Sequence, residues 1–268
     1  MKRILIVAVL LLVSVVFVQP VAAITGGELD GEGHPNVGLM IADIDGEPQW
    51  RCTGTLIAPR VFLTAGHCVG DGATAARVWF DTDLTDNPDY PYGGPSAHEG
   101  TPIPHPLYSW ADADHHDVGV VILDEPVADI EPATLAGPDM LAQLKKARIL
   151  EGGYEEGAFF RSVGYGGMLE SWPPPVLAYD RVRRFSESEY VSLTQVHLHL
   201  SQKAVFDEGG SCFGDSGGPV FWVDPDGNEI IAAVTSTGDA QCIATGLNYR
   251  VDIPEILQWI VDQIPSEE

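Results

Sequence analysis

The sequence predicts an all-β fold. Between residues 36 and 127, short apolar runs rich in valine, isoleucine and phenylalanine alternate with clusters of glycine, aspartate and proline, and the second half of the chain repeats this texture. Runs of four to eight such residues between turn signals are typical of strands. The predicted strands are residues 37–42, 55–57, 77–80, 118–123, 161–164, 182–185, 191–200, 219–223 and 230–236.

A long helical pattern is found near the C-terminus, over residues 253–263. Asp252 and Glu255 resemble a capping box, Pro254 lies in the first turn, and Pro265 ends the pattern. A stripe of apolar residues predicts one buried helix face, and it consists of Ile253, Ile256, Leu257, Ile260, Val261 and Ile264.

Residues 1–23 have the pattern of a secretory signal. Lys2 and Arg3 form a basic start, an apolar run of fifteen residues follows, and residues 21–23 form a small-residue exit. The run is shorter than the ~20 residues that span a bilayer. We therefore expect signal removal, a mature chain that begins at Ile24, and export to an extracellular or periplasmic location, without a membrane partner.

The charge of the chain restricts its partners. The formal net charge is −25, and loss of Lys2 and Arg3 makes it about −27. So acidic a surface repels nucleic acid and anionic membranes. With 268 residues, the chain has enough material for one large domain or two small ones.

The glycine-rich stretch at residues 211–220 contains the strongest candidate nucleophile. Ser216 stands between Gly214 and Gly218, and glycine permits the sharp turn that exposes a hydroxyl and directs N–H groups toward it. This spacing also matches the nucleophile elbow of α/β-hydrolases, where histidine follows serine in the chain. All eight histidines here precede Ser216, which excludes that order.

The chain instead supplies the order His67, Asp117, Ser216, and it resembles the trypsin/chymotrypsin-like serine proteases. The resemblance extends from Ile24 to the C-terminus. Its motifs lie at residues 24–27, 52–57, 63–68, 105–108, 116–123, 164–166 and 211–220.

The resemblance implies a protease domain over residues 24–268, built from two antiparallel six-stranded β-barrels packed at right angles. The first barrel would cover about 24–131 and the second about 132–251, followed by the helix at 253–263. His67 and Asp117 would come from the first barrel and Ser216 from the second.

Catalytic roles also follow from the resemblance. Ser216 would attack the peptide bond, His67 would act as its general base, and Asp117 would orient His67. The N–H groups of Gly214 and Ser216 would form the oxyanion hole. Ser236 would support Asp117, although an ordinary strand serine is an open alternative.

In this family a freed Ile-like N-terminus inserts, and its ammonium pairs with the carboxylate before the nucleophile. The corresponding groups here are Ile24 and Asp215. Ala23 and Val21 suit signal peptidase, so we expect signal removal itself to complete the site. A cut elsewhere, followed by a second trimming step, is the alternative.

Four cysteines in an exported protein imply two disulfides, for which three pairings exist. The resemblance selects Cys52–Cys68 and Cys212–Cys242. Zinc is disfavoured because the chain lacks a C-x-x-C pair, and we predict no metal in the active site.

Specificity is predicted from glycines at three positions that the family uses to read its substrate: Gly210, Gly238 and Gly246. They would leave a wide neutral slot for large apolar side chains. Asp207, Glu208 or Asp239 reaching the slot would instead give basic or broad specificity. The predicted substrate-binding set is Gly210, Ser211, Phe213, Ser236, Gly238 and Gly246.

His115 and His116 should be exposed loop residues, and His197 and His199 should cover the polar face of a strand.

The expected activity is that of a monomeric endopeptidase acting on proteins or peptides; an inactive protease-fold binding protein is the alternative. Calcium is a candidate ligand of the acidic loop formed by Asp81, Asp83, Asp86 and Asp89.

Overall fold

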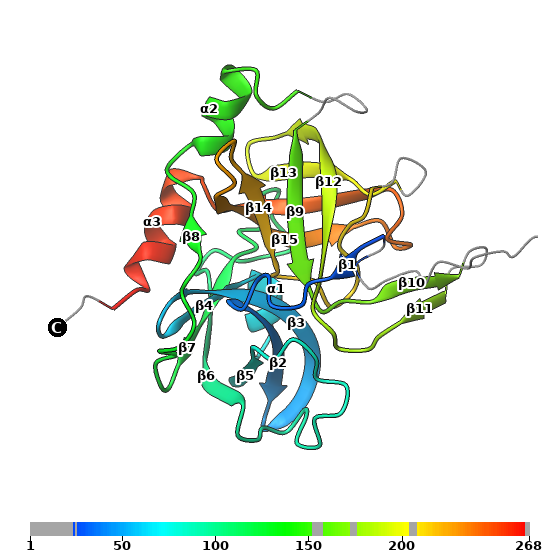
Figure 1. Ribbon diagram of the computed structural model, residues 1–268. Helices are drawn as coiled ribbons and strands as arrows, with labels where there is room; N and C mark the ends of the chain where they lie inside the picture. Colours follow the sequence, from blue (N-terminus) through cyan, green and yellow to red (C-terminus); the bar gives the residue numbers. More distant parts are fainter. Residues whose placement is uncertain (1–23, 25, 152–157, 172–175, 204–207, 266–268) are drawn as a thin grey trace, which may run out of the picture.

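The computed structural model describes residues 24, 26–151, 158–171, 176–203 and 208–265. The predicted signal at 1–23 lies outside these residues. The predicted all-β class is confirmed: two closed six-stranded antiparallel barrels make up most of the molecule, one built from β2–β7 and one from β9 and β12–β16 (Figure 1).

The first barrel closes in the order β2-β3-β4-β7-β6-β5. Side chains alternate along its strands because successive residues of a strand point to opposite faces. Met40 and Ala42 pack in the barrel interior, whereas Leu39 and Ile41 pack in the cluster shared with the second barrel. Its strands are β2 (Val37–Ile44), β3 (Glu47–Ala58), β4 (Val61–Thr64), β5 (Ala75–Trp79), β6 (Ala97–Pro104) and β7 (Gly119–Leu123).

The second barrel is closed by pairing of β9 with β12. Two short strands are added to it, β1 (Glu28–Leu29) on β12 and the parallel strand β8 (Thr134–Leu135) on β15, and β10 (Met168–Ser171) pairs with β11 (Val176–Ala178) outside it. The barrel strands are β9 (Phe159–Gly164), β12 (Arg184–Leu193), β13 (His197–Ser201), β14 (Pro219–Val223), β15 (Glu229–Gly238) and β16 (Thr245–Arg250).

One hydrophobic cluster joins the two barrels and the C-terminal helix. Trp79 from the first barrel, Tyr249 from the second and Ile260 from the helix are all fully buried in it. Burial of a large apolar side chain contributes about 1.5–3 kcal/mol. This shared cluster therefore fixes the barrels against each other, which a site assembled from both of them requires.

The predicted strand at 191–200 is wrong in one respect, since the structure divides it between β12 and β13. Thr194 and His197 close a tight turn between the strands through one backbone hydrogen bond and two hydrogen bonds of the Thr194 hydroxyl. An apolar run that continues through a hairpin gives no signal of the break.

The C-terminal helix α3 spans Pro254–Asp262, but the predicted capping box is wrong. Ile253 occupies the N-cap position, with no side-chain capping bond. Asp252 is fully buried and is committed elsewhere: it pairs with Arg250 and accepts a bond from the Leu141 N–H. Leu141 belongs to the first turn of α2 (Met140–Lys146), a short helix that the sequence patterns did not predict. No helix among the described residues is long and apolar enough to cross a bilayer.

A buried charge network anchors the N-terminal segment to the second barrel. His34 contacts Asp30 through Nδ1 and Glu229 through Nε2, the latter at 2.9 Å. Arg183 donates to Asp30 at 2.7 Å, and Arg161 reaches Glu229 at 2.5 Å. Burial lowers the pKa of His34, but the two carboxylates outweigh it and raise that pKa to about 9.

This network predicts a pH-dependent stability. The folded-state pKa of His34 lies above the unfolded value, so its contribution is fully present below about pH 6.5 and is lost as the pH rises through 9. Urea unfolding at pH 6 and at pH 9.5 measures it. We expect the wild type to lose up to about 3 kcal/mol more than His34→Gln between these values. An equal loss in both proteins would contradict the assignment.

Candidate active site

The central contact of the site joins Asp117 to His67. His67 lies on the single-turn helix α1 (Gly66–Val69), and Asp117 lies just before β7. The Asp117 carboxylate accepts bonds from the His67 backbone N–H at 2.9 Å and contacts Nδ1 at 3.0 and 3.1 Å. Both contacts hold the imidazole in one orientation, with Nε2 directed away from the carboxylate.

Asp117 is fully buried, and its charge is stabilised by hydrogen bonds from both barrels. Burial raises its pKa, but the bonds from His67 and Ser236 outweigh burial, and the pKa is lowered overall. Ser236, from β15, donates its hydroxyl to Oδ2 at 2.5 Å. The structure thus places Ser236 beside Asp117, where it keeps the carboxylate ionised.

Ser216 lies in a tight turn that only glycine neighbours permit. Gly214 has φ +98° and Gly217 has φ +79°, and a Cβ at Gly217 would lie 2.0 Å from the Thr64 hydroxyl oxygen. The turn is joined to β15 because the Gly217 N–H donates to Thr235 and the Thr235 N–H donates to Gly218. The spacing of glycines in the sequence therefore reflects both backbone conformation and close packing.

Ser216 and His67 line one hollow of about 260 Å³. Within the part of the chain that the structure describes, the N–H groups of Gly214 and Ser216 donate to no protein acceptor. Two neighbouring donors beside the candidate nucleophile are what an oxyanion hole requires. The hollow is lined by His67, Ser211, Cys212, Phe213, Ser216, Thr235, Ser236, Thr237, Gly238, Asp239 and Cys242.

Thr53 is a positioning residue that sequence reasoning missed. Its hydroxyl donates to the Gly214 carbonyl at 2.8 Å and accepts from the Tyr165 N–H at 3.2 Å, while its own N–H donates to the Ser216 carbonyl at 2.8 Å. One residue of β3 thus holds both ends of the segment Gly214–Ser216, which we call the oxyanion segment. The available signal was that threonine stands here where the resembled family has glycine.

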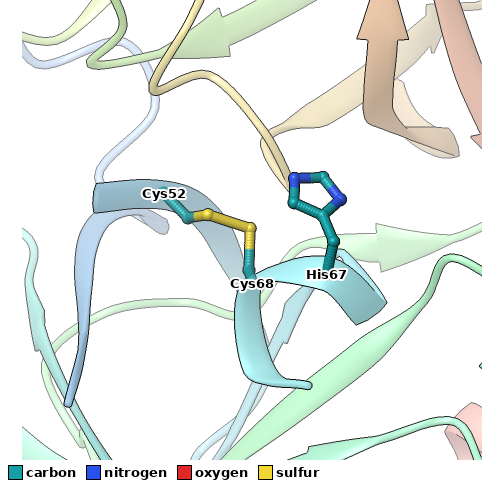
Figure 2. Close-up of side chains that lie close together, drawn as sticks. All are labelled: Cys52, His67 and Cys68. Carbon is teal, nitrogen blue, oxygen red and sulfur yellow. A yellow bond between two sulfur atoms is a disulfide. The ribbon is translucent and has the colours of Figure 1, made fainter. Parts of the chain in front are cut away.

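Two disulfides join Cys52 to Cys68 and Cys212 to Cys242. The first ties β3 to α1 next to His67 (Figure 2), and the second ties the segment before Ser216 to the loop after β15. Each bridge therefore holds a segment that carries a candidate catalytic residue.

Potential metal ligands gather at one place in the described residues, where atoms of Cys52, His67 and Cys68 lie within 4.8 Å of one another. Both sulfurs belong to the disulfide shown in Figure 2, so neither is a thiolate ligand. The acidic loop was the other candidate, for calcium. Asp81, Asp83, Asp86 and Asp89 line a common hollow, but no three of their oxygens converge to that distance. As placed, they do not form a cation cage, and calcium binding stays a prediction.

Asp215 is the second fully buried carboxylate of the site. It accepts N–H bonds from Gly166 at 2.7 Å and Cys212 at 2.9 Å, and burial raises its pKa to about 6. Ile24 is also fully buried, with its segment packed against Glu208 and Gly209. In this uncleaved chain Ile24 carries no ammonium, so the predicted Ile24–Asp215 pair stays a prediction.

The space beside two of the three predicted pocket glycines is filled. The side chain of Gln202 lies against Gly210 and Gly246, neither of which lines the hollow, whereas Gly238 does. Ser211, Phe213 and Ser236 line it as well.

The acidic residues that left specificity open have other partners. Asp239 lines the hollow but accepts backbone N–H bonds from its own loop, residues 241–245. Burial raises its pKa, but these bonds outweigh burial, and the pKa is lowered overall. Glu208 is buried and accepts from Ser201 and the Lys203 N–H. Asp207 lies outside the described residues.

The expectation that His115 and His116 are exposed is wrong. Both are half-buried: His115 packs on Trp110 with 4.5 Å between ring centroids, and His116 stacks on His105 at 5.1 Å. Trp110, itself 47% exposed, lies 5.9 Å from the His67 ring. Sequence reasoning missed this aromatic beside the site. His197 and His199 alternate with buried leucines along β13, as expected for one strand face.

Comparison with known proteins agrees with this geometry. The chain is 27% identical to Serine protease 1 of Drosophila melanogaster, over 84% of this chain and 79% of the relative. It is 25% identical to Lectizyme of Glossina austeni, over 78% and 73%. It is 26% identical to the human atrial natriuretic peptide-converting enzyme over 82% of this chain, but spans only 21% of that protein. The family model described as Trypsin matches residues 32–260, so the chain belongs to the trypsin family of serine endopeptidases.

Proposed function

We propose that the protein is a secreted serine endopeptidase that cleaves peptide bonds through His67, Asp117 and Ser216. The observation that carries the proposal is the hydrogen-bonded Asp117–His67 pair facing the hollow that Ser216 shares. A protease-fold binding protein would have no need to keep a buried carboxylate ionised beside a histidine.

The proposed reaction has two stages. His67 Nε2 takes the Ser216 proton as Oγ attacks the carbonyl carbon, and the oxyanion receives the N–H groups of Gly214 and Ser216. His67 then returns the proton to the leaving amine, which leaves an acyl-enzyme. Water, activated by the same histidine, releases the acid and regenerates Ser216.

The substrate pocket supports cleavage after an uncharged residue. Asp239 is the one carboxylate among the described residues that line the hollow, and its oxygens accept backbone N–H bonds from its own loop, which leaves them less able to bind lysine or arginine. The sequence-based expectation was a large apolar residue at this position.

Location, partners and activation are also part of the proposal. The predicted signal and the two disulfides support an oxidising location outside the cytoplasm. Proteins or peptides are the substrates, and we propose a monomer. Signal removal would free the Ile24 ammonium to pair with Asp215, and that pairing would hold the oxyanion segment in its active form.

Replacement of the nucleophile tests the catalytic assignment. We expect Ser216→Ala to lower kcat by roughly 10⁶, because the general base then has no hydroxyl to activate. Hydrolysis of a peptide library and labelling by a fluorophosphonate measure the loss. Ser192→Ala, a matched change on β12, should keep both. A Ser216→Ala protein that still reacts with the probe would exclude Ser216 as the nucleophile.

The support that Ser236 gives to Asp117 predicts a second result. We expect Ser236→Ala to lower kcat by about tenfold, at the lower end of what a hydrogen bond to a charged group contributes. Asp117 loses a hydrogen bond that lowers its pKa and fixes its orientation, so it should hold His67 less well and kcat should fall while KM changes little. Ser236→Thr keeps a hydroxyl and should restore kcat. An unchanged kcat in Ser236→Ala would contradict this role.

The activation hypothesis predicts that one extra residue abolishes activity. A mature chain that retains Ala23 places an amide where the ammonium belongs, so it should fold but turn over substrate poorly. Ile24→Val keeps a free β-branched N-terminus and should be active. The free amine has an unfolded pKa of ~8, which pairing raises, so activity should persist below that value and fade as the pH rises through the raised one. Normal turnover by the extended chain would refute this mechanism.

A further inference from the structure

Two segments of the chain form walls of the hollow beside Ser216. One wall is the segment Ser211–Phe213, and the other is the end of β15 at Gly238. Gly238 pairs with Gly246 of β16, so Gly246 lies next to the second wall in the same sheet. A side chain that reaches both Gly246 and the segment Ser211–Phe213 would close the slot between the two walls.

Gln202 occupies that position. It follows β13, and only 3% of its surface is exposed. A Cβ at Gly210 would lie 2.2 Å from Gln202 Cγ, and a Cβ at Gly246 would lie 2.7 Å from Gln202 Nε2. The side chain therefore fills the volume that the two glycines leave vacant.

The Gln202 amide has a defined orientation. Nε2 donates to the Ser211 carbonyl at 3.1 Å and to its hydroxyl oxygen at 3.2 Å. A carbonyl oxygen only accepts, so the amide nitrogen must face it. The opposite atom, Oε1, is buried and has no hydrogen-bond partner among the described residues. The side chain is thus held in place by Ser211, a residue that lines the hollow.

We infer that Gln202 closes the base of the primary specificity pocket and limits the enzyme to short uncharged side chains, such as alanine, valine and threonine, at the cleaved position. The inference rests on the proposed peptidase function. It replaces the expectation of large apolar residues, because the slot at Gly210 and Gly246 is filled rather than open.

Two variants separate pocket depth from pocket polarity. Gln202→Ala removes the side chain and opens the slot, whereas Gln202→Met keeps similar length and removes only the amide. Peptide-library cleavage should favour short residues in the wild type. Gln202→Ala should gain roughly tenfold or more in relative kcat/KM for phenylalanine and tyrosine over alanine, and Gln202→Met should not. Gln258→Ala, on the exposed face of α3, is the matched control and should retain the wild-type profile.

A binding measurement is independent of turnover. p-Cresol, a mimic of the tyrosine side chain, should bind Gln202→Ala in calorimetric titration and should not bind the wild type or Gln202→Met. Thermal melts verify that each variant is folded. If Gln202→Ala does not fold, the peptide-library cleavage profile of the wild type tests the inference by itself.

The outcomes distinguish the inference from the function on which it rests. A wild-type enzyme that labels with a fluorophosphonate but prefers phenylalanine or tyrosine overturns the role of Gln202 and leaves the peptidase assignment intact. The same holds for wild-type enzyme that binds p-cresol, or for aromatic cleavage that rises equally in Gln202→Met. Absence of labelling and of turnover in the processed wild type overturns the proposed function, and the inference with it.

Discussion

A buried negative charge, the Asp117 carboxylate, is the constraint on which the site depends. An uncompensated carboxylate in a protein interior is strongly unfavourable, so its hydrogen-bond donors must be supplied by the fold. His67 comes from the first barrel and Ser236 from the second. The contacts that keep Asp117 ionised thus also hold together the two barrels whose residues His67 and Ser216 line one hollow.

Asp215 is also a buried carboxylate, but its hydrogen bonds compensate the cost of burial less completely. Two backbone N–H groups bind it, but burial still raises its pKa to about 6 in the uncleaved chain. With a folded-state pKa above the unfolded value, its ionisation destabilises the chain as the pH rises through 6. A cation delivered to this carboxylate would remove that penalty. The ammonium that we propose for Ile24 would be stabilised beside Asp215 in this way.

Rigidity around the reacting groups comes from several modest contacts. Thr53 holds the oxyanion segment from β3, and the two disulfides hold the segments that carry His67 and Ser216. Accurate orientation of a nucleophile and its base accounts for a large part of the rate that such enzymes achieve. In contrast, Gln202 donates to Ser211, which lines the hollow, and the role that we infer for it is the selection of substrates.

The all-β class, the order of His67, Asp117 and Ser216, and most central strands could be predicted from the sequence because they depend on local signals. These signals are apolar runs between turn residues and glycines where the backbone turns sharply. The sequence did not indicate β6, whose two prolines and glycine weaken a strand pattern, or the break between β12 and β13. The bond that Asp252 accepts from the Leu141 N–H and the packing of Gln202 against Gly246 follow only from the folded arrangement of the chain. Both depend on contacts between residues far apart in the chain. Glycines in a sequence indicate free space, but they do not show which distant side chain occupies it.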